Sequence, residues 1–214
     1  INLDTINEIN FELEESITEM NEIVVTGLSH STERRTTPIP ITTIAPLQLK
    51  QIASTNLIDA IATQPGVAQV TTGVGISKPV IRGLGYSRVV VINDGIRQEG
   101  QQWGDEHGIE IDENSVYKVE ILKGPASLAY GSDALAGVIN LFASPTLPSG
   151  SIQANVLLNY QTNNGLMATS VNAAGNQKGM VWDLRYSAKM AHAYKNRYDG
   201  YVFNSGLDEN SFSA

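Results

Sequence analysis

Residues 116–142 have the sequence VYKVEILKGPASLAYGSDALAGVINLF. Its first part, VYKVEIL, alternates β-branched and polar side chains, which is typical of a strand. Pro125 stands where the first turn of a helix accepts proline, and Gly131 stands where a helix ends. The stretch is therefore predicted to form a strand, a short helix and a second strand. Gly124 and Gly137 indicate tight turns or close backbone approach rather than chemistry.

The composition limits the class of protein. With 214 residues, of which 42% are hydrophobic and 17% charged, the chain is long enough to bury a core in one or two domains. It contains no cysteine, which removes disulfides and cysteine metal sites. No run of about 18 apolar residues is present, so a spanning helix is excluded and a membrane role would have to come through strands.

The charge is unevenly spread along the chain. Residues 1–33 carry eight of the 22 acidic residues and no Lys or Arg, whereas the remaining 14 acidic residues balance 14 basic ones. Nucleic-acid binding needs a basic face that neutralises phosphates, so nucleic acid is not an expected partner. The acidic segment is interpreted as a solvated extension.

Three short segments carry a resemblance to a known family. The sequences KGPAS at 123–127, YG at 130–131 and AGVIN at 136–140 resemble the closing signature of the plug domain of TonB-dependent outer-membrane receptors. The resemblance implies an α+β plug domain followed by antiparallel transmembrane β-barrel strands, here an incomplete barrel in the outer membrane. It also implies a transporter, with no enzymatic activity and no cofactor.

The remainder of the plug is predicted from helix and strand patterns. Ser54 is a suitable N-cap for a helix that carries Leu57, Ile58 and Ile61 on one face and is stopped by Pro65 and Gly66. KPVIRG at 78–83 and RVVVINDG at 88–95 are predicted strands. In the family, an arginine in the position of Arg82 pairs with acidic barrel residues. Lys123 stands where the family usually has arginine, and lysine lacks the two-pronged geometry that orients a carboxylate.

The N-terminal part has two interpretations. NEIVVTG at 21–27 is a β-prone run that is similar to a TonB box, with Glu22, Ile23, Val24, Val25 and Thr26 as the TonB-binding residues. TonB would then pair with this segment by strand addition. The alternative is an ordinary short strand. Within residues 1–20, Ile9 to Ile17 resemble the last strand of the carboxypeptidase-regulatory-like domain that precedes the plug in Bacteroidetes-type receptors.

A polar, glycine-punctuated loop lies between residues 96 and 115. In the family such a loop faces the incoming substrate, so the candidate substrate-facing residues are Trp103, Asp105, Glu106 and His107. Imidazole and carboxylates together offer a mixed N/O donor set, and His107 is the candidate metal ligand. A solvated loop is the alternative.

After residue 150 the pattern becomes an alternation of apolar and polar residues, interrupted in its first strand by Leu157. Apolar residues at 152, 154, 156, 158 and 160 alternate with polar residues at 153, 155, 159 and 161. The segment around 182–190 repeats the alternation. Trp182, Leu184 and Tyr186 are predicted to face outer-membrane lipid, while Ser187 points into the lumen, where substitution should be tolerated. About three strands are predicted, with a turn at 175–179.

The predicted order is the end of an extension domain with an acidic linker (1–20), a TonB box (21–27), a plug domain (28–145) and the first strands of an outer-membrane β-barrel (150–214). The function expected from the resemblance is TonB-dependent import of a metal-bearing small molecule: an iron chelate such as a siderophore, haem or a metal ion. A soluble periplasmic β-rich binding module is one alternative. Import of glycans or peptides is the other.

Overall fold

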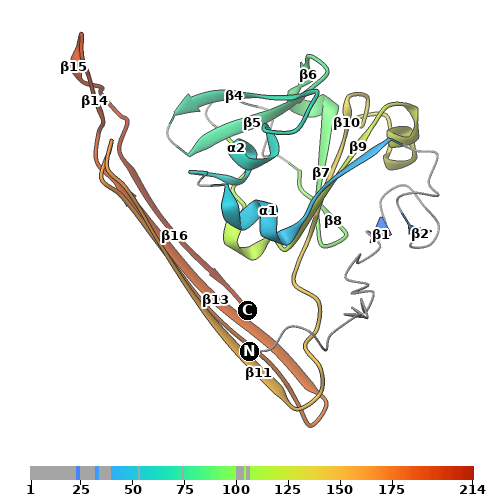
Figure 1. Ribbon diagram of the computed structural model, residues 1–214. Coiled ribbons are helices and arrows are strands. Elements are labelled where there is room, and N and C mark those ends of the chain that lie inside the picture. The colour runs from blue at the N-terminus through green and yellow to red at the C-terminus, as the bar shows by residue number, and fades with distance from the viewer. Residues whose placement is uncertain are drawn as a thin grey trace, which may run out of the picture.

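The computed structural model describes residues 23–24, 32–33, 40–52, 54–73, 75–99, 104 and 107–214. The central element is a five-stranded sheet with the order β3-β9-β10-β7-β8 (Figure 1). Its strands are β3 (Ile41–Ile44), β7 (Val89–Asn93), β8 (Ile96–Arg97), β9 (Lys118–Lys123) and β10 (Gly137–Phe142). β7 and β10 run parallel, and the other pairs run antiparallel.

Both faces of this sheet are covered, so its inner strands are apolar. Val119, Ile121 and Ile139 belong to the larger core cluster on one face, whereas Leu122 and Val138 belong to a second cluster on the other. Neighbouring residues of a strand point to opposite faces. This explains the continuous apolar run of β7 at residues 89–92, which a sheet with one wet face would not show.

Two short helices lie on the larger core. They are α1 (Pro46–Gln51) and α2 (Leu57–Ile61). Leu57, Ile58 and Ile61 are buried, as the apolar stripe predicted. The N-cap prediction was wrong: Asn56, not Ser54, caps α2 by accepting a hydrogen bond from the amide of Asp59 at 3.0 Å. Neither helix among the described residues is long and apolar enough to cross a membrane.

A small second sheet packs beside α2. It consists of β4 (Val67–Gly73), β5 (Ile76–Ile81) and β6 (Leu84–Gly85), followed by the 3-10 turn η2 (Tyr86–Arg88). Asn56 of the α2 cap donates to the hydroxyl of Ser77 on β5 at 3.2 Å, which ties the helix to this sheet. We call residues 40–142 the plug.

The stretch at 116–142 folds as predicted, with a 3-10 rather than an α-helical turn. β9 leads into η4 (Pro125–Tyr130), which ends at Gly131, and β10 follows. Gly137 is required by close approach: its φ is +155°, and an added Cβ would lie 2.6 Å from the carbonyl oxygen of Leu122. Another 3-10 turn, η3 (Glu113–Ser115), precedes β9 and becomes important below.

Four long or medium strands form a separate antiparallel sheet, which we call the wall sheet. In order they are β11 (Ser151–Gln161), β12 (Leu166–Gln177), β13 (Met180–Ala191) and β16 (Leu207–Ser213). A short hairpin of β14 (Lys195–Asn196) and β15 (Gly200–Tyr201) extends between β13 and β16. The sheet stands beside the plug and is open, with no closed barrel among the described strands (Figure 1).

Two details of the wall sheet differ from the sequence prediction. A fourth strand, β16, is present because backbone pairing with β13 makes up for its weak alternation in LDENSFS. The turn after β12 is tighter than predicted and is centred on Lys178 and Gly179. Gly175 lies inside β12, where the absence of a side chain leaves room for the ring of Trp182 on β13.

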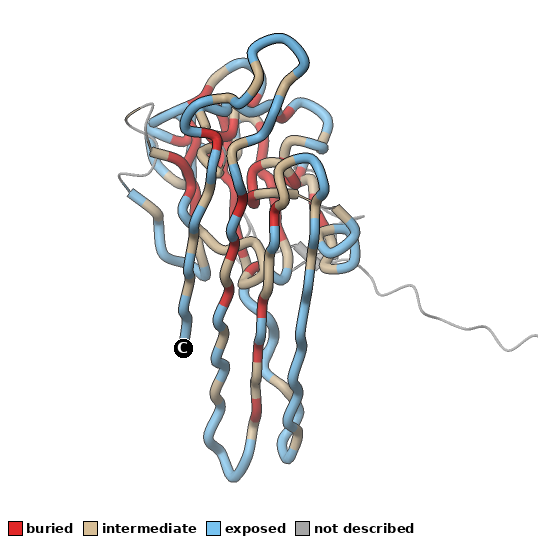
Figure 2. The backbone as a smooth tube through the Cα atoms, turned by 90° about the vertical axis from the view of Figure 1, so that its left-hand side faces the viewer, coloured by how far each residue is buried: buried red, intermediate tan, exposed pale blue. Residues whose placement is uncertain are grey.

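The two faces of the wall sheet differ as the alternation predicted. Large apolar side chains are exposed on the face turned away from the plug: Ile152, Val156, Leu158, Tyr160, Met167, Val171, Leu184, Tyr186, Met190 and Phe212. On the other face, polar residues next to the plug are buried: Ser170, Asn172, Ser187 and Lys189. Figure 2 shows buried and exposed positions alternating along the two middle strands. Ser187 is therefore not a tolerant lumen position, because the plug covers it.

Candidate functional site

The wall sheet and the plug meet at a buried ion pair. Lys189 of β13 is 4% exposed, and its Nζ lies 2.6 Å from Oε2 of Glu113 in η3. The same ammonium donates to the backbone carbonyl of Thr55, just before α2, at 3.4 Å. It also lies 3.6 Å from Glu209, its cross-strand partner on β16. One wall lysine thus holds two separate segments of the plug.

A second polar contact lies beside the ion pair. The hydroxyl of Ser187 donates to Oδ2 of Asp112 at 2.5 Å, and the hydroxyl of Ser170 lies 2.8 Å from that of Ser187. Because a hydroxyl carries a single hydrogen, Ser170 is the donor in the second contact. Asp112 also accepts from the amide of Asn114 at 3.0 Å, which fixes η3. The Asp112 carboxylate therefore joins β13 to the segment that begins η3, and the hydroxyl of Ser187 extends this link to β12.

The electrostatics of this contact are dominated by burial. Burial raises the pKa of Glu113 above its ordinary value, the Lys189 charge and hydrogen bond oppose this, and the negative charge of Asp112 adds a smaller increase. Removing one partner of such a pair leaves an uncompensated buried charge, which is strongly destabilising. Sequence reasoning missed Glu113 as a partner, although the inward position of Lys189 in the alternation signalled that a plug carboxylate was needed.

The structure brings the two predicted plug–barrel residues together. Lys123 is buried and its Nζ donates to the carbonyl of Pro65 at 2.5 Å. Arg82 has a left-handed backbone, with φ of 52°, and its amide donates to the carbonyl of Gly66 at 3.1 Å. Burial, and then the Arg82 charge, lower the pKa of Lys123.

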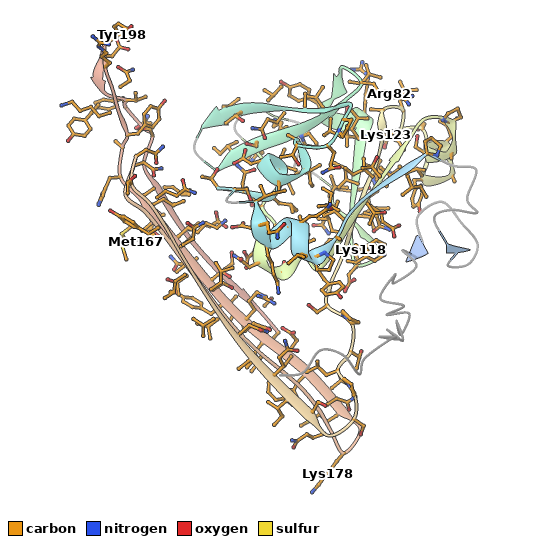
Figure 3. The ribbon with its side chains drawn as sticks, viewed as in Figure 1. Arg82, Lys118, Lys123, Met167, Lys178 and Tyr198 are labelled. Atoms are coloured by element: carbon orange, nitrogen blue, oxygen red, sulfur yellow. The ribbon has the colours of Figure 1, made fainter. Side chains whose placement is uncertain are left out.

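These two cations do not touch the described wall strands. Figure 3 shows Arg82 and Lys123 on the side of the plug away from the wall sheet. Among the residues that the structure describes, no carboxylate forms an ion pair with either. Two adjacent cations repel each other, so the pair is suited to carboxylates brought by another segment.

The described part of the predicted substrate-facing loop lies at the end of the plug next to the β4–β5 turn. The amide of Ile109 donates to the carbonyl of Ser77 at 3.4 Å, so His107 lies beside the start of β5. An added Cβ on Gly75 in that turn would lie 3.0 Å from Leu207, the first residue of β16. This is the end of the wall sheet that carries Tyr198, opposite the Lys178 turn (Figure 3). Trp103, Asp105 and Glu106 lie outside the described residues.

The structure describes only part of the N-terminal segment. Ile23–Val24 form strand β1, which pairs antiparallel with β2 at Thr32–Glu33. The backbone of this segment is therefore extended, as strand addition requires. The predicted TonB-binding residues Glu22, Val25 and Thr26, together with residues 1–20, lie outside the described part. Within the described residues, no three His, Asp or Glu side chains gather as a metal site.

Comparisons with known proteins identify the fold and family. Residues 33–138 match the model of the TonB-dependent Receptor Plug Domain. The chain is 30% identical over 145 residues to the iron-regulated outer membrane virulence protein of Vibrio cholerae serotype O1, a match that covers 64% of this chain and 22% of that protein.

Solved structures agree with this assignment at the level of the fold. The structure of FpvA of P. aeruginosa bound to heterologous pyoverdines matches with a TM-score of 0.68 and 18% sequence identity. The match covers 80% of this chain and 22% of the FpvA chain. The structure of the siderophore receptor PirA of Acinetobacter baumannii matches with a TM-score of 0.60 and 17% sequence identity. The match covers 72% of this chain and 25% of the PirA chain.

The chain spans less than a third of the length of each of these proteins. The match to the plug model, the iron-regulated outer-membrane relative and the arrangement of plug and wall sheet all place it in the outer membrane. The chain belongs to the TonB-dependent outer-membrane receptors, and it comprises their plug domain and four antiparallel strands of the surrounding wall.

Proposed function

We propose that the complete protein actively imports an iron chelate across the outer membrane, with TonB supplying the energy. The observation that carries this proposal is a plug domain seated against a wall sheet whose outer face is apolar and whose inner face is polar and joined to the plug. A soluble binding module would have no use for an exposed apolar face of this size. The wall sheet is instead suited to lipid.

The contact with TonB is proposed at Glu22, Ile23, Val24, Val25 and Thr26. Strand addition uses main-chain N–H and C=O groups, and the extended backbone of β1 supports this role. The segment precedes β3, which lies at an edge of the central sheet and, among the described strands, pairs with β9 alone. A pull on the segment would therefore reach the plug at an edge strand.

The cargo proposal rests on the relatives. The Vibrio cholerae relative is named as iron-regulated. Two structural neighbours are named as a ferric enterobactin receptor and a siderophore receptor, and FpvA is described as bound to heterologous pyoverdines. We propose that Trp103, Asp105, Glu106 and His107 face the cargo, with His107 as a metal ligand. The turn at Lys178 is short, whereas the connection between β13 and β16 at Tyr198 is long, and the longer loops of outer-membrane barrels are extracellular. The position of His107 beside the β4–β5 turn, at the Tyr198 end, therefore supports a cargo-facing loop. Arg82 and Lys123 are proposed to pair with carboxylates of wall strands other than the four described.

The test uses the complete receptor in Gram-negative cells that lack their own siderophore receptors. Uptake of radioactive iron is measured from ferric enterobactin and ferric pyoverdine, and haemin is tested by growth, each with and without TonB. Import of at least one probe that disappears without TonB is the expected result. Import of labelled glycans or peptides, with no uptake of the iron probes, would replace the cargo assignment. A complete protein that stays monodisperse without detergent would favour the soluble module.

A further inference from the structure

Lys78 on β5 carries a buried ammonium without a hydrogen-bond acceptor. The residue is 1% exposed, and no oxygen of the described residues accepts a hydrogen bond from its Nζ. The other two buried lysines of the described chain are satisfied, because Lys189 pairs with Glu113 and Lys123 donates to the carbonyl of Pro65. A buried cation is costly unless it is paired or hydrogen-bonded. Lys78 is therefore suited to receive an anion.

The ring of Tyr86 covers this ammonium. Nζ of Lys78 lies 4.8 Å from the ring centroid, which is within the range of a cation–π contact. Tyr86 is 37% exposed, so the ring that contacts the buried ammonium is itself partly at the surface. The ring holds the ammonium without neutralising its charge. A stronger partner for Lys78 would have to displace Tyr86.

The backbone of Tyr86 is strained. Its φ is +57°, in the left-handed region that is uncommon for a residue with a bulky side chain. Tyr86 is the first residue of η2 and follows Gly85, the last residue of β6. Strain of this kind persists where the surroundings hold it, and it clusters at functional sites. A move of the ring away from Lys78 can release this strain, which lowers the cost of opening the cover.

The covered ammonium lies at the end of the plug that is directed toward Tyr198. The hydroxyl of Ser77 accepts from Asn56 of the α2 cap, so Ser77 faces α2 and its neighbour Lys78 faces the opposite side of the small sheet. Figure 1 shows the small sheet beyond α2, on the side of the plug toward the β14–β15 hairpin. The carbonyl of Ser77 also accepts from Ile109, which follows the candidate cargo-facing residues. Lys78 is therefore next to the part of the plug that is assigned to the cargo.

We propose that Lys78 and Tyr86 form a binding site for a single carboxylate, which displaces the ring and accepts hydrogen bonds from the ammonium. One ammonium neutralises one negative charge, so a carboxylate fits this site better than a dianionic phosphate does. The carboxylate comes either from the iron chelate or from the receptor itself, outside the described residues. The chelate as source rests on the proposed function and narrows the cargo to chelates with a free carboxylate.

The first experiment removes the charge in the complete receptor. Lys78→Met keeps the length of the side chain, and Lys50→Met, at an exposed lysine of the plug, is the matched control and should behave as wild type. Affinity for the iron probes is measured, together with the resistance of the plug to protease in urea without any probe.

The two sources of the carboxylate give different results. If the chelate supplies it, Lys78→Met should weaken binding of haemin, which has free carboxylates, at least tenfold. Binding of ferric enterobactin, which has none, should stay within twofold, and protease resistance should be equal or higher. If the receptor supplies the carboxylate, Lys78→Met should lower protease resistance and leave both affinities within twofold, because a buried carboxylate loses its partner. Unchanged affinities together with undiminished resistance overturn the proposal.

The second experiment tests the cover and does not depend on the cargo. The amine of Lys78 is labelled with an acylating reagent in the purified complete receptor, and the labelled peptide is quantified by mass spectrometry. Tyr86→Ala should accelerate labelling at least fivefold, whereas Tyr86→Phe, which keeps the ring, should stay within twofold of wild type. Labelling of exposed Lys50 should be the same in all samples. Equal labelling of Lys78 in the two Tyr86 variants overturns the proposal.

Failure of the proposed function would appear differently, as no binding of any iron probe by the unmodified receptor. The protease resistance of Lys78→Met then decides the proposal by itself. A loss of resistance supports a carboxylate of the receptor, and undiminished resistance overturns the site.

Discussion

Lys189 on β13 and Glu113 in η3 form a buried ion pair, with 2.6 Å between Nζ and Oε2, although 76 positions separate them in the sequence. The pair joins the wall sheet to the segment that leads directly into β9, a central strand of the plug. The wall therefore contacts the plug close to its structural centre, and not only through the linker after β10.

The first prediction concerns the pH dependence of stability at this contact. The pKa of Glu113 is raised from 4.5, mainly by burial. Between 4.5 and the raised value the folded protein binds more protons than the unfolded one, so the contribution of Glu113 to the free energy of unfolding decreases as pH rises through that window. Glu113→Gln should flatten the dependence of the melting temperature on pH above 4.5, measured on the complete receptor in detergent. Exposed Glu110→Gln is the control, and a Glu113→Gln profile parallel to wild type contradicts the prediction.

The second prediction tests the lipid face. Leu184→Arg should cost about 2–4 kcal/mol of folding free energy in bilayers if the residue lies near the midplane. Gln153→Arg is the matched control, because Gln153 faces the polar side and lies in the row next to the one that contains Leu184. Urea titrations of the complete receptor in lipid vesicles give both values. Equal losses for the two variants would show that the faces have been assigned incorrectly.

The third prediction concerns TonB. Val24→Pro removes a backbone donor from β1 and fixes φ, so it should abolish uptake while surface binding of the iron probe is retained. Val24→Ala keeps the backbone donor and should transport. Uptake and surface binding of the iron probe are measured separately in energised cells. Full uptake by the Val24→Pro variant would contradict the assignment of this segment as the TonB contact.

The fourth prediction concerns Gly137, the first residue of β10. Gly137→Ala places a Cβ 2.6 Å from the carbonyl oxygen of Leu122 and 3.1 Å from Ile81, so it should destabilise the plug by at least about 2 kcal/mol. Gly83→Ala, also at positive φ but with no atom within 4 Å, separates backbone strain from the clash and should cost about 1 kcal/mol. The stabilities of the two variants are compared by the protease resistance of the plug at increasing urea concentration. Equal losses of resistance would argue against a close approach of Gly137 to the Leu122 carbonyl.

The fifth prediction concerns the cargo-facing loop. His107→Ala and the double change Asp105→Ala/Glu106→Ala should each weaken binding of the iron probe to the complete receptor at least fivefold, because they remove the proposed N and O donors. Glu110→Ala, exposed and close in sequence, is the control. Equilibrium binding to intact cells gives the affinities. Unchanged affinity in both variants would leave the loop as a structural element only.

Much of the secondary structure was predictable because it depends on local periodicity. The alternation at 152–160 and 182–190 predicted which residues face away from the plug, and Leu184 and Tyr186 are exposed there. β16 was missed because its sequence, LDENSFS, has apolar residues only at Leu207 and Phe212 and therefore does not alternate. Backbone pairing with β13 holds this segment as a strand. The N-cap was misplaced because Ser54 and Asn56 are both good caps, and the helix begins only at Leu57, where Asn56 accepts from the amide of Asp59.

The sequence by itself determined the strand, turn and strand of 116–142, the apolar stripe of α2 and the two faces of the wall sheet, since all of these follow from the spacing of residues within one element. Only the tertiary structure decided which distant side chains meet. Lys189 was visible as an inward charge, but Glu113 became its partner because η3 lies against β13. Arg82 and Lys123 were named separately, and folding places them together around Pro65 and Gly66. A buried charge must be neutralised or hydrogen-bonded, and the partner is selected by three-dimensional packing, which has no signature in local spacing.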